Sequence, residues 1–207
     1  MMRRTLVSVA AAALLVVVGA GCETSSSESG SLGPTTPSGA TAIPGGPMEQ
    51  LPVPAAPKIP TSQQEAQDTV VRYLQQTLDA LPTGTSLDGT RYMVGDGTAY
   101  CEDDPAGRDA PVHVEDWRDM KVPAGTDVKA LVAQVGEIWE GWGWDVIERD
   151  GFDKPNRFGY GPDGYVLQIQ ARPDPTQAPS LTGTSPCFPG NLRQDDVQRP
   201  PVLNQSR

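Results

Sequence analysis

The sequence predicts an α+β fold: a single two-layer domain with a mostly antiparallel sheet and two helices packed on one face. Two stretches, 62–81 and 126–142, carry apolar residues at three- and four-residue steps, which is typical of amphipathic helices. The remaining stretches hold five or six short apolar segments separated by Gly, Pro and Asp, which is typical of antiparallel strands joined by turns.

The first helix begins at a capping box. Ser62 and Glu65 have the spacing at which a hydroxyl and a carboxylate satisfy the free amides of a helix start. Pro82 and Gly84 end the helix. Its apolar face is formed by Ala66, Val70, Tyr73, Leu74, Thr77, Leu78 and Leu81.

Short extended pieces are expected next. Residues 91–94 and 98–102 flank a Gly-Asp-Gly turn at 95–97. In the segment 112–115, Val alternates with His and Glu, as in a strand with one buried face.

The second helix has Thr126 or Asp127 as its cap, and Gly141 and Gly143 stop it. Residues 144–148 are expected to form the next strand. The apolar stripe of this helix consists of Val128, Leu131, Val132, Val135, Ile138, Trp139 and Trp142.

A hairpin is expected after a loop. Strands 157–160 and 165–171 flank the turn 161–164, Gly-Pro-Asp-Gly, in which Pro presets one dihedral and Gly accepts a positive φ. The last ordered piece is expected at 180–188, held in place by Cys187.

The N-terminal residues are typical of an exported bacterial lipoprotein. Two arginines precede an uncharged apolar run of 13 residues, 6–18, which is shorter than the roughly 20 residues that span a bilayer. The segment 18–22, Val-Gly-Ala-Gly-Cys, resembles the bacterial lipobox, although a Gly stands where that pattern usually has Leu. We expect residues 1–21 to be a signal peptide and Cys22 to carry the lipid, with an ordinary secretory signal as the alternative.

Residues 22–60 are expected to form the lipidated Cys and a disordered tether. Eight Pro and many Ser, Gly and Thr stand between 23 and 60, with almost no apolar periodicity, so this region cannot bury enough surface to offset its conformational entropy. The globular α+β domain is then expected over 61–190, followed by a polar C-terminal tail over 191–207.

The mature chain is acidic. Without the two leader arginines it carries 14 basic and 26 acidic side chains, a formal net charge of −12. This charge, without a Lys or Arg cluster, argues against a nucleic-acid partner and against a basic patch that binds anionic headgroups. Membrane attachment is therefore expected through the N-terminal lipid.

Cysteine usage agrees with export to an oxidising compartment. Besides Cys22, the chain has Cys101 and Cys187, which we expect to form a disulfide, with two buried free thiols as the alternative. One His and no Cys-x-x-Cys do not supply the usual ligands of a zinc site. No metal and no cofactor are expected.

Four segments carry a family resemblance: 98–104 (TAYCEDD), 139–144 (WEGWGW), 156–160 (NRFGY) and 185–188 (SPCF). Together they resemble small mycobacterial lipoproteins of the LppA type over most of residues 61–190. The resemblance implies a membrane-anchored actinobacterial protein and implies no particular activity.

Three consecutive carboxylates, Glu102, Asp103 and Asp104, with Asp109 nearby, are a candidate contact for a hard cation or a polar ligand. The spacing of an EF-hand loop is missing, and acidic loops are more commonly only solvated. Paired carboxylates also serve glycoside hydrolysis, which needs two of them about 5 to 10 Å apart.

His113 is the single imidazole of the chain, so any triad with a His would have to use it. It is expected with Glu115 on the polar face of a strand, where an exposed His needs no functional explanation. No Gly-x-Ser-x-Gly elbow, His-Glu-x-x-His motif or phosphate loop is present, and no catalytic residue is assigned.

Aromatic residues are concentrated around the end of the second helix and in the following strands: Trp139, Trp142, Trp144, Phe158, Tyr160 and Tyr165. Trp139 and Trp142 have helical spacing and are expected in the core, whereas Trp144 is a candidate for ligand contact.

The expected function is a lipid-anchored module on the extracytoplasmic face of the cell membrane that binds an envelope glycolipid, glycan or protein without catalysis. A small envelope hydrolase using acidic residues is the alternative, and a purely structural envelope protein is the third. Binding needs a concave aromatic or apolar patch, whereas catalysis needs a cleft with perturbed titratable groups.

Overall fold

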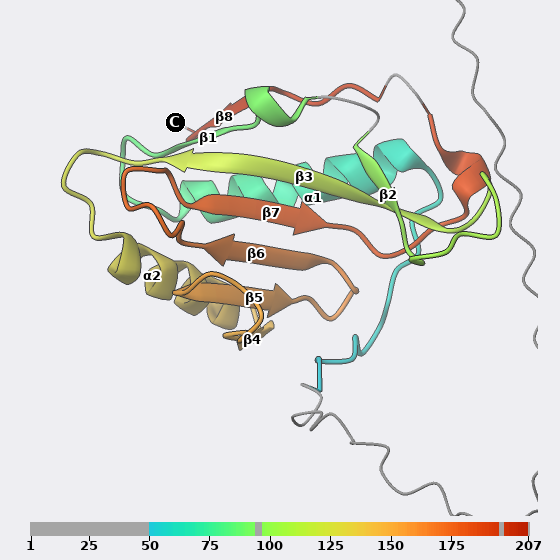
Figure 1. Cartoon of the computed structure of the whole chain (residues 1–207), viewed down its shortest axis with the longest axis horizontal. Coiled ribbons are helices and arrows are strands. Elements are labelled where there is room, and N and C mark those ends of the chain that lie inside the picture. The colour runs from blue at the N-terminus through green and yellow to red at the C-terminus, as the bar shows by residue number, and fades with distance from the viewer. Residues whose placement is uncertain (1–49, 94–96, 195–196, 207) are drawn as a thin grey trace, which may run out of the picture. The chain divides into compact units, whose positions relative to one another are not determined.

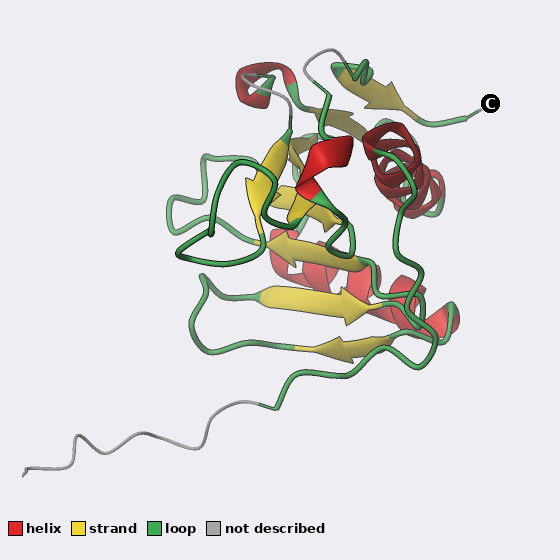
Figure 2. Ribbon diagram, turned by 90° about the vertical axis from the view of Figure 1, so that its right-hand side faces the viewer, coloured by secondary structure: helices red, strands yellow, loops and turns green. Residues whose placement is uncertain are grey.

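Two helices lie against one face of an antiparallel sheet in the computed structural model, which describes residues 50–93, 97–194 and 197–206 (Figure 1). Every strand pair within these residues is antiparallel. Figure 2 shows both helices on the same side of the strands. The predicted α+β fold class is confirmed.

The described strands form an eight-stranded sheet of order β4-β5-β6-β7-β3-β1-β8, with β2 paired to β3 outside this row. The elements are α1 (Gln63–Asp79), β1 (Ser86–Asp88), η1 (Thr90–Tyr92), β2 (Thr98–Tyr100), β3 (Val112–Lys121), α2 (Val128–Gly141), β4 (Asp145–Ile147), β5 (Asn156–Tyr160), β6 (Val166–Gln170), β7 (Ser180–Thr184), η2 (Gly190–Leu192) and β8 (Val202–Asn204). Helix α1 covers β3 and β7, and α2 covers β5 and β4.

Helix α1 begins where the capping box predicts. The hydroxyl of Ser62 accepts a hydrogen bond from the Glu65 amide at 3.0 Å. The Glu65 carboxylate, however, binds the amide and hydroxyl of Thr61 at 2.8 and 2.6 Å, one residue further back than a capping box requires. The Thr61 hydroxyl, followed by its amide, lowers the pKa of Glu65.

Helix α2 is capped by Asp127, whose carboxylate accepts from the amides of Lys129 and Ala130 at 2.9 and 3.2 Å. Its buried stripe packs on β5 at Gly159, where a Cβ atom would lie 2.8 Å from the Trp139 ring. Only a glycine at this position lets the helix approach the strand so closely. Residues on the buried stripe are Leu131, Val132, Val135, Gly136 and Trp139.

The predicted hairpin is confirmed as β5 and β6, which pair from Asn156 with Gln170 to Tyr160 with Val166. Its turn closes with a hydrogen bond from the Gly164 amide to the Gly161 carbonyl at 3.0 Å, and Gly164 has a φ of +90°.

The expectation of an extended segment from residue 91 is wrong. Thr90 to Tyr92 form the 3₁₀ turn η1. The Asp88 carboxylate accepts from both the amide and the hydroxyl of Thr90, at 3.0 and 2.6 Å. Such a side-chain turn bends the chain directly after β1.

Strand β3 extends well beyond the predicted segment 112–115 and ends at Lys121. Asp116 and Arg118 lie on its buried face, beneath α1, where the Asp116 carboxylate accepts from Arg118 at 2.8 Å and from Gln67 at 3.1 Å. Charged residues normally mark an exposed face. The alternation of buried apolar and exposed polar residues therefore ends in the sequence at Asp116, although the strand continues.

The chain end expected as a polar tail from residue 191 contains η2 and β8. Strand β8 pairs with β1, and its Leu203 is buried. Gln205 then donates its side-chain amide to the carbonyls of Leu78 and Leu81, at 3.2 and 2.8 Å, near the end of α1. A three-residue strand with one buried side chain is too short to give a periodic signal.

Most of the predicted tether, together with the predicted signal peptide 1–21 and Cys22, lies outside the described residues. Its last part is described and contacts the domain: the amides of Ala56 and Lys58 donate to the carbonyls of Pro162 and Asp163, at 2.8 and 2.9 Å. Within the described ranges, no helix is long and apolar enough to cross a membrane.

Candidate functional site

A cavity of about 640 Å³ lies beside the C-terminal parts of α1 and α2, and we call it the aromatic cavity. Its lining comes from the second half of α1 and from the segment that follows α2: Tyr73, Gln76, Asp79, Ala80, Trp142 and Trp144.

Three rings form the apolar part of the lining. The ring centroids of Tyr73 and Trp144 are 4.9 Å apart at 77°, and those of Trp142 and Trp144 are 5.7 Å apart at 76°. Edge-to-face contacts of this kind fix ring orientation. Trp144 is 7% exposed, whereas Trp142 and Tyr73 are half-buried. Trp144 therefore lies at the base of the cavity, and Trp142 and Tyr73 are the rings that a ligand could contact.

Tyr73 is held by groups from two elements. Its hydroxyl donates to the carboxylate of Asp163, in the β5–β6 turn, at 2.6 Å. The guanidinium of Arg72 lies 4.3 Å from the ring centroid. Burial, followed by the hydrogen bond with Asp163, raises the pKa of Tyr73.

Asp79 supplies the charge of the cavity. Its Oδ1 accepts from the Ser206 amide at 2.7 Å and from the Gln75 side chain at 2.8 Å. The Ser206 amide is the main cause of its lowered pKa, which keeps the carboxylate ionised at neutral pH.

The helix ends add to this negative charge. The C-terminal end of a helix carries a partial negative charge, and neither α1 nor α2 has a basic residue in its last turn. The lining itself is therefore negative, with the Arg72 guanidinium nearby against the Tyr73 ring.

Of the predicted contact residues, Trp144 lines the aromatic cavity. Trp139 lies in the core as expected, fully buried, and its Nε1 donates to the Thr77 hydroxyl at 3.0 Å. Trp142 was also expected in the core, but it is only half-buried and lines the cavity as well. The physical reason is its place at the C-cap of α2, one residue beyond the helical stripe.

The predicted disulfide between Cys101 and Cys187 is present. His113 lies on the face of β3 that points away from the helices, as predicted, with Nδ1 3.6 Å from Cys101 Sγ and Nε2 3.4 Å from Glu115 Oε1. The His113 side chain is 17% exposed and thus more buried than expected. Its hydrogen bond is the largest cause of the lowered pKa of Glu115.

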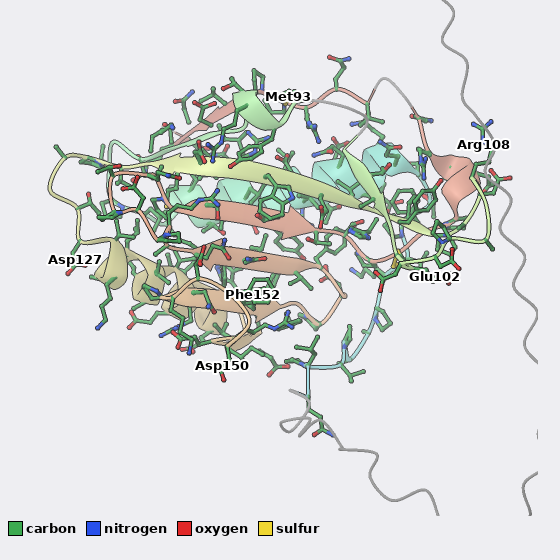
Figure 3. All side chains as sticks on the ribbon, in the orientation of Figure 1. Met93, Glu102, Arg108, Asp127, Asp150 and Phe152 are labelled. Carbon is green, nitrogen blue, oxygen red and sulfur yellow. A yellow bond between two sulfur atoms is a disulfide. The ribbon has the colours of Figure 1, made fainter. Side chains whose placement is uncertain are left out.

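Glu102, Asp103 and Asp104 are exposed in the loop between β2 and β3. Figure 3 shows Glu102 and Arg108 at the end of the molecule opposite Asp127. None of the three lines the aromatic cavity. The predicted contact residues therefore do not form one site: Trp144 lines the aromatic cavity, His113 lies on the opposite face of the sheet, and the three carboxylates lie in the β2–β3 loop.

Sequence reasoning missed Gln76 and Asp79. Both lie on the polar side of α1, where such residues are usually only solvated, and no local pattern distinguishes them. Tyr73 was assigned to the apolar face of the same helix; it packs partly buried against the core and also lines the cavity.

Compared with protein-family models, curated proteins and solved structures, the chain matches none, so these comparisons assign it to no family.

Proposed function

We propose that this chain is a lipid-anchored binding module on the extracytoplasmic face of the cell membrane, and that the aromatic cavity is its ligand site. The observation that carries the proposal of binding is the cavity lining: accessible Trp142 and Tyr73 above Trp144, beside Gln76 and Asp79. Aromatic walls with a few polar groups are typical of small-molecule sites.

A sugar ring suits this lining. The C–H face of a pyranose packs on an indole, while its hydroxyls can donate to the Asp79 carboxylate and exchange hydrogen bonds with the Gln76 amide. The negative charge of Asp79 and of the helix ends disfavours phosphorylated and carboxylated sugars. The proposed ligand is therefore a neutral or amine-bearing sugar of an envelope glycan or glycolipid.

The polar lining supports binding over hydrolysis. Glycosidases place two carboxyl groups across the scissile bond, and one of them must be protonated to act as the acid. Among the residues that line the aromatic cavity, Asp79 is the one carboxylate, and its lowered pKa keeps it ionised. It serves as a hydrogen-bond acceptor and cannot supply the proton.

The ligand site is tested by titrating neutral and amino oligosaccharides into the protein and following tryptophan fluorescence and heat. Trp142→Ala should weaken binding about tenfold, the loss of one aromatic contact of about 1.4 kcal/mol. Phosphorylated sugars should bind more weakly than their neutral counterparts.

Trp117→Ala is the matched control, because Trp117 is a half-buried indole on β3, on the sheet face away from the helices. An equal loss of affinity in both variants, or no binding of any sugar, would refute the proposed site. Release of reducing ends during the titration would instead favour the hydrolase.

The anchor is tested separately. Cys22→Ser should move the protein from the membrane fraction to the soluble fraction, because the variant has no thiol at position 22 to acylate. Mass spectrometry of the wild-type N-terminus should give a diacylated Cys22 as the first residue. A mature chain that begins elsewhere would contradict the lipid anchor and leave the ligand site untouched.

A further inference from the structure

The Cys101–Cys187 disulfide lies beside the only imidazole of the chain. Cys187 is exposed, whereas Cys101 and His113 are half-buried. The Nδ1 atom of His113 is 3.6 Å from Sγ of Cys101, and the two sulfurs and the imidazole lie within 4.8 Å of one another. The two ends of the disulfide are therefore unequal: Cys187 is the exposed residue, and Cys101 contacts the imidazole.

Glu115 sets the proton positions on His113. Its Oε1 lies 3.4 Å from Nε2, and an ionised carboxylate can only accept, so Nε2 carries a proton. Nδ1 of the neutral ring is then unprotonated and faces the sulfur of Cys101. When the ring takes up a second proton, Nδ1–H points at that sulfur while Glu115 balances the charge.

We propose that the Cys101–Cys187 disulfide is a thiol-exchange site, at which an external thiolate attacks Cys187 and the released Cys101 thiolate is stabilised by His113. Exchange is faster when the leaving thiolate is stabilised and when the attacked sulfur is accessible. The arrangement favours both, because the exposed residue and the residue beside the imidazole are the two ends of the same bond.

The first step forms one bond and breaks one. The sulfur of the thiolate bonds to Sγ of Cys187, the Cys101–Cys187 bond breaks, and its electron pair goes to Sγ of Cys101. His113, once it has taken up a proton from solvent at Nδ1, pairs with the new thiolate or transfers that proton to it. With a dithiol as the reductant, its second thiolate attacks the mixed disulfide at its own first sulfur, which releases Cys187 as a thiolate and leaves the reductant oxidised.

The direction of attack is tested on the wild-type protein. A limiting amount of 2-mercaptoethanol is added, freed thiols are alkylated at once with iodoacetamide, and the peptides are mapped without reduction. The mercaptoethanol adduct should lie on Cys187 and the alkyl group on Cys101, in about tenfold excess over the reverse. Equal labelling, or an adduct mainly on Cys101, would overturn the proposal.

The role of His113 is tested by the rate of exchange with the same thiol at pH 7. His113→Asn should react about tenfold more slowly, at the low end of what a positioned proton donor contributes. Glu115→Gln should show a smaller decrease, because the amide still holds the ring but no longer balances its charge.

Glu102→Gln is the control: it removes a neighbouring carboxylate that the structure leaves exposed, and so should leave the rate unchanged or raise it slightly by reducing repulsion of the thiolate. An unchanged rate in His113→Asn would overturn the proposal. If that variant does not fold, the labelling of the wild-type protein still decides.

Discussion

Arg118 is a charged side chain with no exposed surface, enclosed between α1 and the sheet. Its Nη2 donates to Asp116 at 2.8 Å, and within the described residues its Nε and Nη1 have no hydrogen-bond partner. The desolvation of two buried charges offsets much of their attraction, so such a pair contributes little net stability. Removing one partner is costly, because the other charge then remains buried alone.

Asp116→Leu should destabilise the fold by about 3 to 5 kcal/mol, since it leaves the Arg118 guanidinium buried without a counter-charge. The double variant Asp116→Leu/Arg118→Met should cost clearly less than the single one, because both charges are gone. Urea unfolding measures the free energies of Asp116→Leu, Arg118→Met and the double variant. A double variant as unstable as the sum of the two single variants would contradict this account.

At the scale of the elements, the segment directly after β8 contacts the C-terminal end of α1. The amide and carbonyl of the Gln205 side chain both bind backbone near the end of α1: the amide donates to the Leu81 carbonyl at 2.8 Å, and the carbonyl accepts from Gly84 at 3.0 Å. The last carbonyls of a helix lack partners inside the helix. A segment more than 120 residues away in sequence supplies them here.

Leu203→Ala should therefore destabilise the domain by about 2 to 3 kcal/mol, the low range for removing a buried Leu side chain from a short edge strand. Val202→Ala, its neighbour at 38% exposure, should change stability by less than about 0.5 kcal/mol. Thermal and urea unfolding of both variants provide the measurement. If Leu203→Ala changed stability as little as Val202→Ala, β8 would not be part of the cooperative unit.

At the scale of the whole molecule, the predictable features are the local ones. Both helices, the β5–β6 hairpin and the Cys101–Cys187 pair follow from caps, periodicity, turn residues and the number of cysteines. Each of these signals lies within a short window of sequence or, for the disulfide, admits a single pairing.

The features that the sequence does not predict depend on distant partners. Asp116 is buried because Gln67 and Arg118 meet it from α1 and β3, and β8 is a strand because β1 lies next to it. The aromatic cavity is assembled in the same way, from residues of α1 and residues beyond α2. A polar residue on a helix gives no local sign that a ring from another element lies beside it.

The last part of the N-terminal segment also carries a mechanical consequence. Lys58 donates to the backbone of Asp163, and the carboxylate of that same residue holds Tyr73 in the wall of the aromatic cavity. If the chain is anchored and binds a ligand as proposed, tension on the segment before Lys58 would reach Tyr73 through these two hydrogen bonds as well as along the covalent chain into α1. Because Asp163 lies in the turn between β5 and β6, the same tension also acts on these two strands of the sheet.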